Sequence, residues 1–194
     1  MTMSLLTASI ERTTTIPDGR PDVGITRLHL DRGTGATTSL VAFPAGWQRL
    51  AAGRYLVGEE FVLLTGTLEI SGAVFVAGDY AWIPAGALRT GTLSPDGALT
   101  LAWFSGPPGW ERSDSGAGAI TQLHLSTAAV PHGCLPLRGD RAGEGPGRSH
   151  VYDGPVTITG PAEVLFVDDW RWLYVEPAVV HTVTGGRVLI RQHG

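Results

Sequence analysis

Four side chains in the first half of the chain are of types that carry out proton transfer and anion binding. Glu59 is a carboxylate that can take up or release a proton, and Tyr55 is a phenol that can donate one. Arg54 and Arg89 are guanidinium groups, which stay charged and hold carboxylates or phosphates through paired hydrogen bonds. Together these groups would suit isomerisation, cyclisation or elimination, because such reactions need positioning and proton transfer but no redox centre.

Short β-rich segments must position these side chains. Seven runs of strand-forming residues are separated by Gly, Pro or Asp turns, and helical periodicity is nearly absent. The runs are TTSLVAF, FVLLTGTLEI, YAWIP, LTLAWF, VTITG, VLFVDD and RWLYVE. With 27 Gly and 13 Pro among 194 residues, this pattern predicts an all-β fold of the sandwich or jelly-roll type.

The two halves of the chain resemble each other, which indicates a duplicated unit. ITRLHL at 25–30 is nearly repeated as ITQLHL at 120–125, and GDYAWIPAGALR at 78–89 aligns with DDWRWLYVEPAVVH at 168–181. A stretch rich in Gly, Pro and Ser separates the two copies. We therefore predict an N-terminal extension over residues 1–19, a first barrel over 20–107, a linker over 108–117 and a second, degenerate barrel over 118–194.

The spacing of glycines, a proline and a glutamate in the first half resembles the cupin superfamily. The residues that carry the resemblance are Gly46, Glu59, Gly66, Gly78, Pro84 and Gly86. The similarity is greatest to the branch that contains the zinc-binding anti-sigma-factor cupins and the acetylacetone-dioxygenase-like cupins. It implies a bicupin of two tandem cupin-type jelly-roll β-barrels, a fold that serves many different activities.

The resemblance also implies where a metal would be held, since cupins commonly use three histidines and one glutamate. Of these four ligands only Glu59 remains in the first half, and Arg89 stands at the histidine position of the second motif. A guanidinium cannot serve as an ordinary ligand of a divalent cation. We therefore expect the first barrel to work without a metal or other cofactor.

The remaining two histidine positions depend on the length of one loop, which leaves two interpretations open. One count places them on Ala52 and Arg54, and a shorter loop places them on Gly53 and Tyr55. An inward Arg54 would leave one positive charge uncompensated, and a bound anion would relieve it. An inward Tyr55 would instead supply an acid. In either case an ion pair between the glutamate and the arginine of the motifs could simply fill the cavity.

Aromatic and histidine side chains complete the set of candidate site residues. Trp47, Phe61, Trp82 and Trp103 are candidates for lining a substrate cavity, with core packing as the alternative. In the second half, His181 takes the histidine position of the second motif and His150 lies near the expected first motif. They form a weak alternative metal site, because a complete site needs at least three convergent ligands.

Composition limits the kinds of molecule that we expect the chain to bind. A net charge of −4 without a basic run argues against nucleic acid and anionic membranes, and no apolar stretch is long enough to span a bilayer. The single Cys134 cannot form an internal disulfide, so we expect a cytoplasmic protein. The expected partner is a small-molecule ligand or substrate, and open strand edges favour a homodimer.

These observations favour one function over two alternatives. The preferred hypothesis is a metal-independent cupin enzyme that acts on a small anionic or oxygenated organic molecule, with a guess that this belongs to secondary metabolism. The first alternative is a non-catalytic small-molecule-binding or regulatory cupin. The second is a metal-dependent dioxygenase that uses the second barrel around His181.

Overall fold

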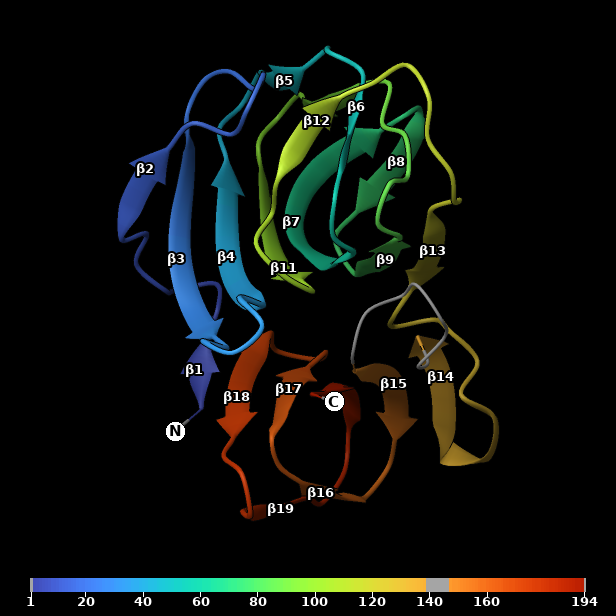
Figure 1. Ribbon diagram of the computed structural model, residues 1–194. Helices are drawn as coiled ribbons and strands as arrows, with labels where there is room; N and C mark the ends of the chain where they lie inside the picture. The colour runs from blue at the N-terminus through green and yellow to red at the C-terminus, as the bar shows by residue number, and fades with distance from the viewer. Residues whose placement is uncertain (1, 139–146, 194) are drawn as a thin grey trace. The chain divides into compact units, whose positions relative to one another are not determined.

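The computed structural model describes residues 2–138 and 147–193, and its regular structure is almost entirely β-strand (Figure 1). Contacts divide the chain into two compact units. The large unit is Ser9–Leu123, and the small unit combines Met1–Ala8 with His124–Gly194. Among the described residues, no helix has the length and apolar character needed to cross a membrane.

The large unit contains a ten-stranded sheet and a two-stranded ribbon, β12–β6. The sheet follows the order β13-β9-β7-β11-β4-β3-β2; β10 pairs with β5 and β7, and β8 pairs with β7. The strands are β2 (Arg12–Thr14), β3 (Val23–Leu30), β4 (Thr37–Phe43), β5 (Trp47–Arg49), β6 (Gly53–Tyr55), β7 (Glu59–Ile70), β8 (Ala73–Val76), β9 (Asp79–Ile83), β10 (Thr92–Ser94), β11 (Ala98–Phe104), β12 (Trp110–Arg112) and β13 (Thr121–His124).

The long strand β7 organises this unit, and Figure 1 shows it curving beside β11. Within β7, Gly66 has a φ of 80°. A Cβ atom there would lie 2.0 Å from the Gly97 carbonyl oxygen, so only glycine lets the two strands approach this closely. The other end of β7 begins at Glu59, opposite Ile83 of β9 and Phe104 of β11.

Apolar side chains from several strands of the large unit pack into one core. Phe61 and Leu63, two positions apart on β7, share a face and are fully buried in it. Phe61 packs edge to face on Phe75 of β8, with ring centres 5.1 Å apart. Each such side chain stabilises the fold by about 1.5–3 kcal/mol relative to an exposed one. This core holds in place the strands that also carry the polar residues described below.

The small unit contains a six-stranded sheet in the order β1-β18-β17-β20-β15-β14 and a ribbon of β16 and β19. Its core includes Val164, Val188 and Ile190. Its elements are β1 (Met3–Ser4), the 3₁₀ turn η1 (Pro131–Gly133), β14 (Cys134–Arg138), β15 (Arg148–Asp153), β16 (Val156–Thr159), β17 (Ala162–Phe166), β18 (Arg171–Val175), β19 (Val180–Val183) and β20 (Arg187–Gln192).

The observed division differs in detail from the boundaries expected from the sequence. The expected N-terminal extension supplies one strand to each unit, since β1 pairs with β18 and β2 pairs with β3. The expected linker contains β12, which pairs with β6 in the large unit. Both segments are therefore integral parts of sheets, because their backbone groups are paired there.

Candidate functional site

A cavity of about 200 Å³ lies within the large unit. Its polar lining consists of Arg49, Tyr55, Glu59 and Arg89 together with several threonines. The rest of the wall is largely apolar and includes Ile16, Phe43, Trp47, Leu68, Ile70 and Phe104. An apolar cavity with a few converging polar groups is the usual form of a small-molecule site.

Alternation along two short strands decides which side chains enter this cavity. In β5, Trp47 and Arg49 are buried and line the cavity, whereas Gln48 between them is exposed. In β6, Gly53 and Tyr55 are buried and Arg54 is partly exposed. Side chains two apart on a strand share a face, so each strand sends its first and third residues inward.

A backbone β-bridge joins β6 to Arg89, the residue at the histidine position of the second motif. Gly53 and Arg89 exchange two backbone hydrogen bonds, of 3.0 and 2.8 Å. The absence of a side chain at Gly53 is required, because a Cβ there would lie 2.4 Å from the Trp110 ring and 2.5 Å from the Glu111 carbonyl oxygen. Trp110 thus packs against the backbone of Gly53, and its ring centre lies 5.1 Å from that of Tyr55.

Glu59 and Arg89 form an ion pair in the cavity wall. Arg89 Nη2 lies 2.6 Å from Glu59 Oε2, and the two side chains are 4% and 12% exposed. The Arg89 guanidinium also lies over the Tyr55 ring, 4.6 Å from its centre, which is cation–π geometry. The carboxylate, the guanidinium and the phenol that the motifs place at these positions therefore lie together in the large unit.

Arg49 adds a second buried guanidinium to the same wall. Its Nη1 donates to Tyr55 Oη at 3.2 Å, its Nη2 donates to Thr92 Oγ1 at 3.4 Å, and its Cζ lies 3.7 Å from the centre of the Trp110 ring. Burial lowers the pKa of Arg49, an effect that Tyr55 opposes and the positive charge of Arg89 reinforces.

The other residues expected at the site lie elsewhere, with the exception of Trp47. Arg54 donates from Nε and Nη2 to Glu111 Oε2 at 3.2 and 3.1 Å and does not line the cavity. Phe61 is buried in the core. Trp82 and Trp103 are buried as well, but they are the cross-strand partners of Glu60 rather than of Glu59. They therefore lie on the opposite face of β7 from the cavity.

Among the residues that the sequence analysis did not identify are Arg49, which lines the cavity, and Trp110, which packs against Arg49. Arg49 could have been predicted from the sequence, because it follows Trp47 by two positions in a β-rich segment and so shares its face. The role of Trp110 could not have been predicted, since it lies in a stretch rich in Gly, Pro and Ser that is typical of a linker.

The donor set of this cavity does not fit a divalent metal ion. Its lining contains one carboxylate, no histidine and two guanidinium groups. Zinc, iron and similar ions need three or more histidine, cysteine or carboxylate ligands, and guanidinium groups repel a cation. The metal chemistry common in cupins therefore finds no suitable ligands here.

The two histidines proposed as an alternative metal site belong to separate sheets of the small unit. His181 is on β19, opposite Ile158, and His150 is on β15, opposite Ile190. Burial lowers the pKa of His150, and the nearby Arg148 lowers it further. Within the small unit alone, the described residues form no group of three His, Cys, Asp or Glu ligand atoms.

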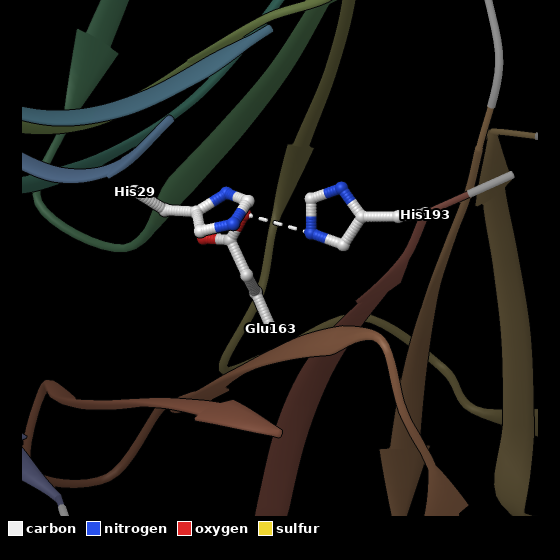
Figure 2. A group of neighbouring side chains, drawn as sticks. All are labelled: His29, Glu163 and His193. Carbon is white, nitrogen blue, oxygen red and sulfur yellow. Dashed lines mark ion pairs between the residues drawn. The ribbon is translucent and has the colours of Figure 1, made fainter. Parts of the chain in front are cut away.

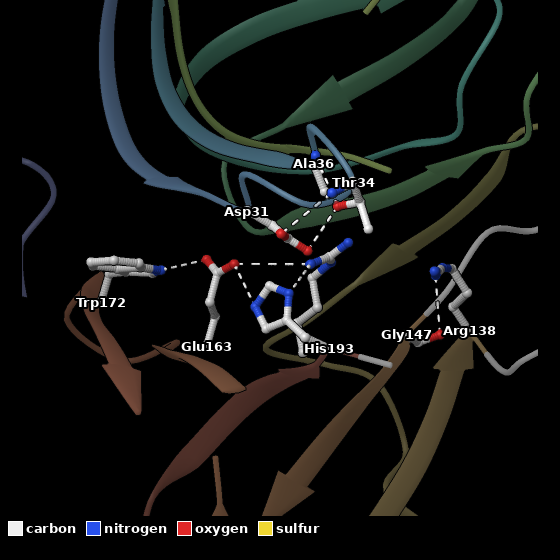
Figure 3. Close-up of polar contacts among 9 residues, drawn as sticks. Asp31, Thr34, Ala36, Arg138, Gly147, Glu163, Trp172 and His193 are labelled. Atoms are coloured by element: carbon white, nitrogen blue, oxygen red, sulfur yellow. Dashed lines mark hydrogen bonds and ion pairs between the residues drawn. The ribbon is translucent and has the colours of Figure 1, made fainter. Parts of the chain in front are cut away.

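The small unit has a buried polar network of its own around Glu163, which is 1% exposed. Figure 2 shows its contact with His193, whose Nε2 lies 3.1 Å from Glu163 Oε1. Figure 3 adds Trp172, whose Nε1 donates to Glu163 Oε2 at 2.9 Å. Arg191 lies 3.9 Å from the same carboxylate. Glu163 thus accepts a hydrogen bond from Trp172 and lies within ion-pair distance of Arg191 and, when the imidazole is protonated, of His193.

Comparisons with known proteins agree with the fold. Residues 7–108 match the family model of the ChrR cupin-like domain. A proposed dioxygenase from Nostoc punctiforme is similar over 98% of this chain and 80% of its own, with a TM-score of 0.67 and 16% identity. The Escherichia coli protein Ylba is similar over 99% and 85%, with a TM-score of 0.55 and 12% identity. A search of curated proteins found no match.

Proposed function

Because the chain belongs to the family of ChrR cupin-like domains, we propose that its large unit is a metal-independent cupin enzyme for a small anionic or oxygenated organic molecule. The observation that carries this proposal is the cavity in which Glu59, Arg89, Tyr55 and Arg49 line one wall. These groups can move a proton and stabilise negative charge, and the donor set is unsuited to a metal.

Each polar residue has a separate role in this proposal. The Glu59 carboxylate acts as a base that removes a proton from a carbon next to a carbonyl group. The electron pair of that C–H bond moves toward the carbonyl oxygen, where Arg89 stabilises the negative charge. Tyr55 accepts a hydrogen bond from Arg49, so its own proton stays available for donation to the product. The proton taken up by Glu59 then returns to Tyr55 through solvent, so that both groups regain their starting state. The net reaction is isomerisation, or elimination or cyclisation where a leaving group or internal nucleophile is present.

A dioxygenase reaction in this cavity has less support. Non-haem iron enzymes of this kind typically use two histidines and one carboxylate, and the described lining of the cavity offers no histidine. The activity ascribed to the Nostoc punctiforme protein is therefore not transferred to this chain. Elemental analysis of protein purified without a histidine tag tests this point, and stoichiometric iron, nickel, manganese or zinc would contradict the proposal.

The experiment that tests the proposed reaction is hydrogen exchange in D₂O with excess EDTA. We expect the protein to catalyse exchange of carbon-bound hydrogen in at least one member of a panel of small oxo acids, followed by NMR. Glu59→Gln should reduce the rate by about 10²-fold or more, the typical contribution of a general base. Glu69→Gln, on the same strand but outside the cavity lining, should leave the rate unchanged.

A non-catalytic binding module is the second candidate, and the direct contact of Glu59 with Arg89 favours it. An ion pair at 2.6 Å can hold a ligand's polar group without reacting with it. Ligand binding without any exchange, in both the wild type and Glu59→Gln, would support this candidate and contradict the enzyme.

We further propose that the whole chain is a bicupin, supported by its similarity to the Nostoc punctiforme structure over nearly its full length.

A further inference from the structure

Arg49 is a buried cation that forms no ion pair with a carboxylate of the described residues. The residue is 2% exposed. Its Nη atoms donate only to the neutral hydroxyl groups of Tyr55 and Thr92, and its Nε is buried without an acceptor. Burying a charge without a counter-charge is costly, and proteins rarely retain such a group without a use for it.

The nearby carboxylates are already paired with other cations. Glu59 contacts Arg89, and Asp18 accepts hydrogen bonds from Arg112 and from the Trp110 indole. The cavity lining therefore carries the positive charges of Arg49 and Arg89 and the negative charge of Glu59. Their sum is one positive charge, which one negative charge on a ligand would balance.

Among the residues that line the cavity, the buried atoms without a hydrogen-bond partner include three donors and one acceptor, Glu59 Oε2. Three buried N–H groups have no acceptor: Nε of Arg49, Nε of Arg89 and Nε1 of Trp47. All three belong to residues that line the cavity. A ligand that accepts hydrogen bonds at more than one atom, and donates few, would satisfy such donors.

The guanidinium of Arg49 is held in a fixed plane. The Trp110 ring lies against it at 3.7 Å, and the Tyr55 ring lies 5.3 Å away. Two hydroxyl groups fix its Nη atoms, so little conformational entropy remains to be lost when a ligand binds. This preorganisation is typical of arginine residues that recognise planar carboxylates.

The size and the walls of the cavity limit the rest of the ligand. Its volume of about 200 Å³ is smaller than the roughly 300–1,000 Å³ of sites for drug-sized ligands. Most of the remaining lining is apolar, with Phe43, Leu68, Ile70 and Phe104 among it. The ligand body should therefore be small and apolar.

We propose that the ligand of this cavity is a small monocarboxylate with an apolar body, and that Arg49 is the residue that binds its carboxylate. The inference rests on the proposed function only in taking the cavity as the substrate site. A dianion such as a phosphate monoester would exceed the single positive charge of the lining. A neutral compound would leave that charge unbalanced.

The test is binding of matched acids and amides to the full chain, measured by NMR titration. The probes are hexanoate and benzoate, with hexanamide and benzamide as neutral isosteres and phenyl phosphate as the dianion. We expect at least one acid to bind about tenfold or more tightly than its amide and than phenyl phosphate, the size of a charge-assisted hydrogen bond. Arg49→Met should abolish the preference for the acid, Arg49→Lys should retain part of it, and the exposed Arg27→Met should leave it unchanged.

The results separate this inference from the proposed function. Loss of the acid preference in Arg49→Met, with the fold checked by circular dichroism, supports the inference even if no hydrogen exchange is found. Equal binding of acids and amides, tighter binding of phenyl phosphate, an unchanged preference in Arg49→Met, or no binding of either acid would each overturn it. Glu59-dependent exchange could still be present in those cases, and it would then support the enzyme alone.

Discussion

We expect the buried charge of Arg49 to lower the stability of the ligand-free large unit, as the cost of the anion site proposed above. Its hydrogen bonds to Tyr55 and Thr92 and its contact with Trp110 recover only part of the hydration that burial removes. Burial also lowers its pKa, which reflects the same loss of hydration. In this proposal, the same charge favours ligand binding and disfavours folding.

The conflict predicts that Arg49→Met stabilises the protein in the absence of ligand. Replacing a buried charge by an apolar side chain of similar length is expected to raise the free energy of unfolding by about 1–4 kcal/mol. Urea unfolding followed by fluorescence measures this change. The exposed Arg27→Met should change it by less than about 0.5 kcal/mol. A large loss of stability in Arg49→Met would mean that its contacts outweigh the cost of burial.

At the scale of single residues, the sequence predicted some of the residues that line the cavity, but not the origin of its second guanidinium. The motif positions of Glu59 and Arg89 could be read because glycines and a proline mark their spacing. The choice between Arg54 and Tyr55 could not be made, since it depends on the length of one loop. Strand β6 turns Tyr55 inward, and the second guanidinium comes from Arg49 instead.

At the scale of elements, the carboxylate of Asp18 is one of the contacts that join a segment of the cavity lining to the rest of the large unit. Residues 14–17 line the cavity, and Asp18 follows them with a φ of 62°, a conformation that aspartate tolerates better than most residues. Asp18 accepts hydrogen bonds from Trp110 Nε1 at 3.1 Å and Arg112 Nε at 2.9 Å. The carboxylate thus connects this wall of the cavity to β12, which carries Trp110.

This connection should weaken in acid. The hydrogen bond from Arg112 is the main cause that lowers the pKa of Asp18 from 3.8 to about 2. Because the folded-state pKa is the lower one, the stabilisation is complete above the unfolded pKa and is lost as the pH falls from about 4 to about 2. The difference in melting temperature between the wild type and Asp18→Asn should therefore be positive at pH 7 and close over that range. A difference that stays constant with pH would contradict it, and the exposed Asp96→Asn serves as control.

The long strands could be predicted from the sequence, and the short ones could not. The all-β cupin fold is confirmed, and TTSLVAF coincides with β4. Strands β5, β6 and β12 have three residues each, too few for a period of two to be recognised. Since these strands carry Arg49, Tyr55 and Trp110, the least predictable elements hold much of the site.

At the scale of the whole molecule, the candidate site belongs to one unit. All lining residues of the cavity fall between Thr14 and Pro108, within Ser9–Leu123. The large unit also has its own apolar core. The buried carboxylate of the small unit, Glu163, accepts a hydrogen bond from Trp172 of the same unit. The homodimer and the cytoplasmic location expected from the sequence stay predictions, and light scattering of the purified protein tests the first.

This arrangement predicts that a fragment of residues 9–123 folds and retains the carboxylate site. Its circular dichroism should show a β-rich fold with a cooperative thermal transition, because its core and sheet are internal to the fragment. Its affinities for hexanoate and benzoate should match those of the full chain within about threefold. An unfolded fragment would mean that the small unit contributes needed stability, and a folded one without binding would mean that the small unit shapes the cavity.

The packing of Trp110 against Gly53 has a consequence for how this protein could evolve. A histidine at position 53 would collide with the indole ring and with the backbone of Glu111. The same indole supports the guanidinium of Arg49. A side chain at position 53 that displaces this indole is therefore expected to remove the support of Arg49 as well, so that gaining a histidine there would cost the proposed anion site.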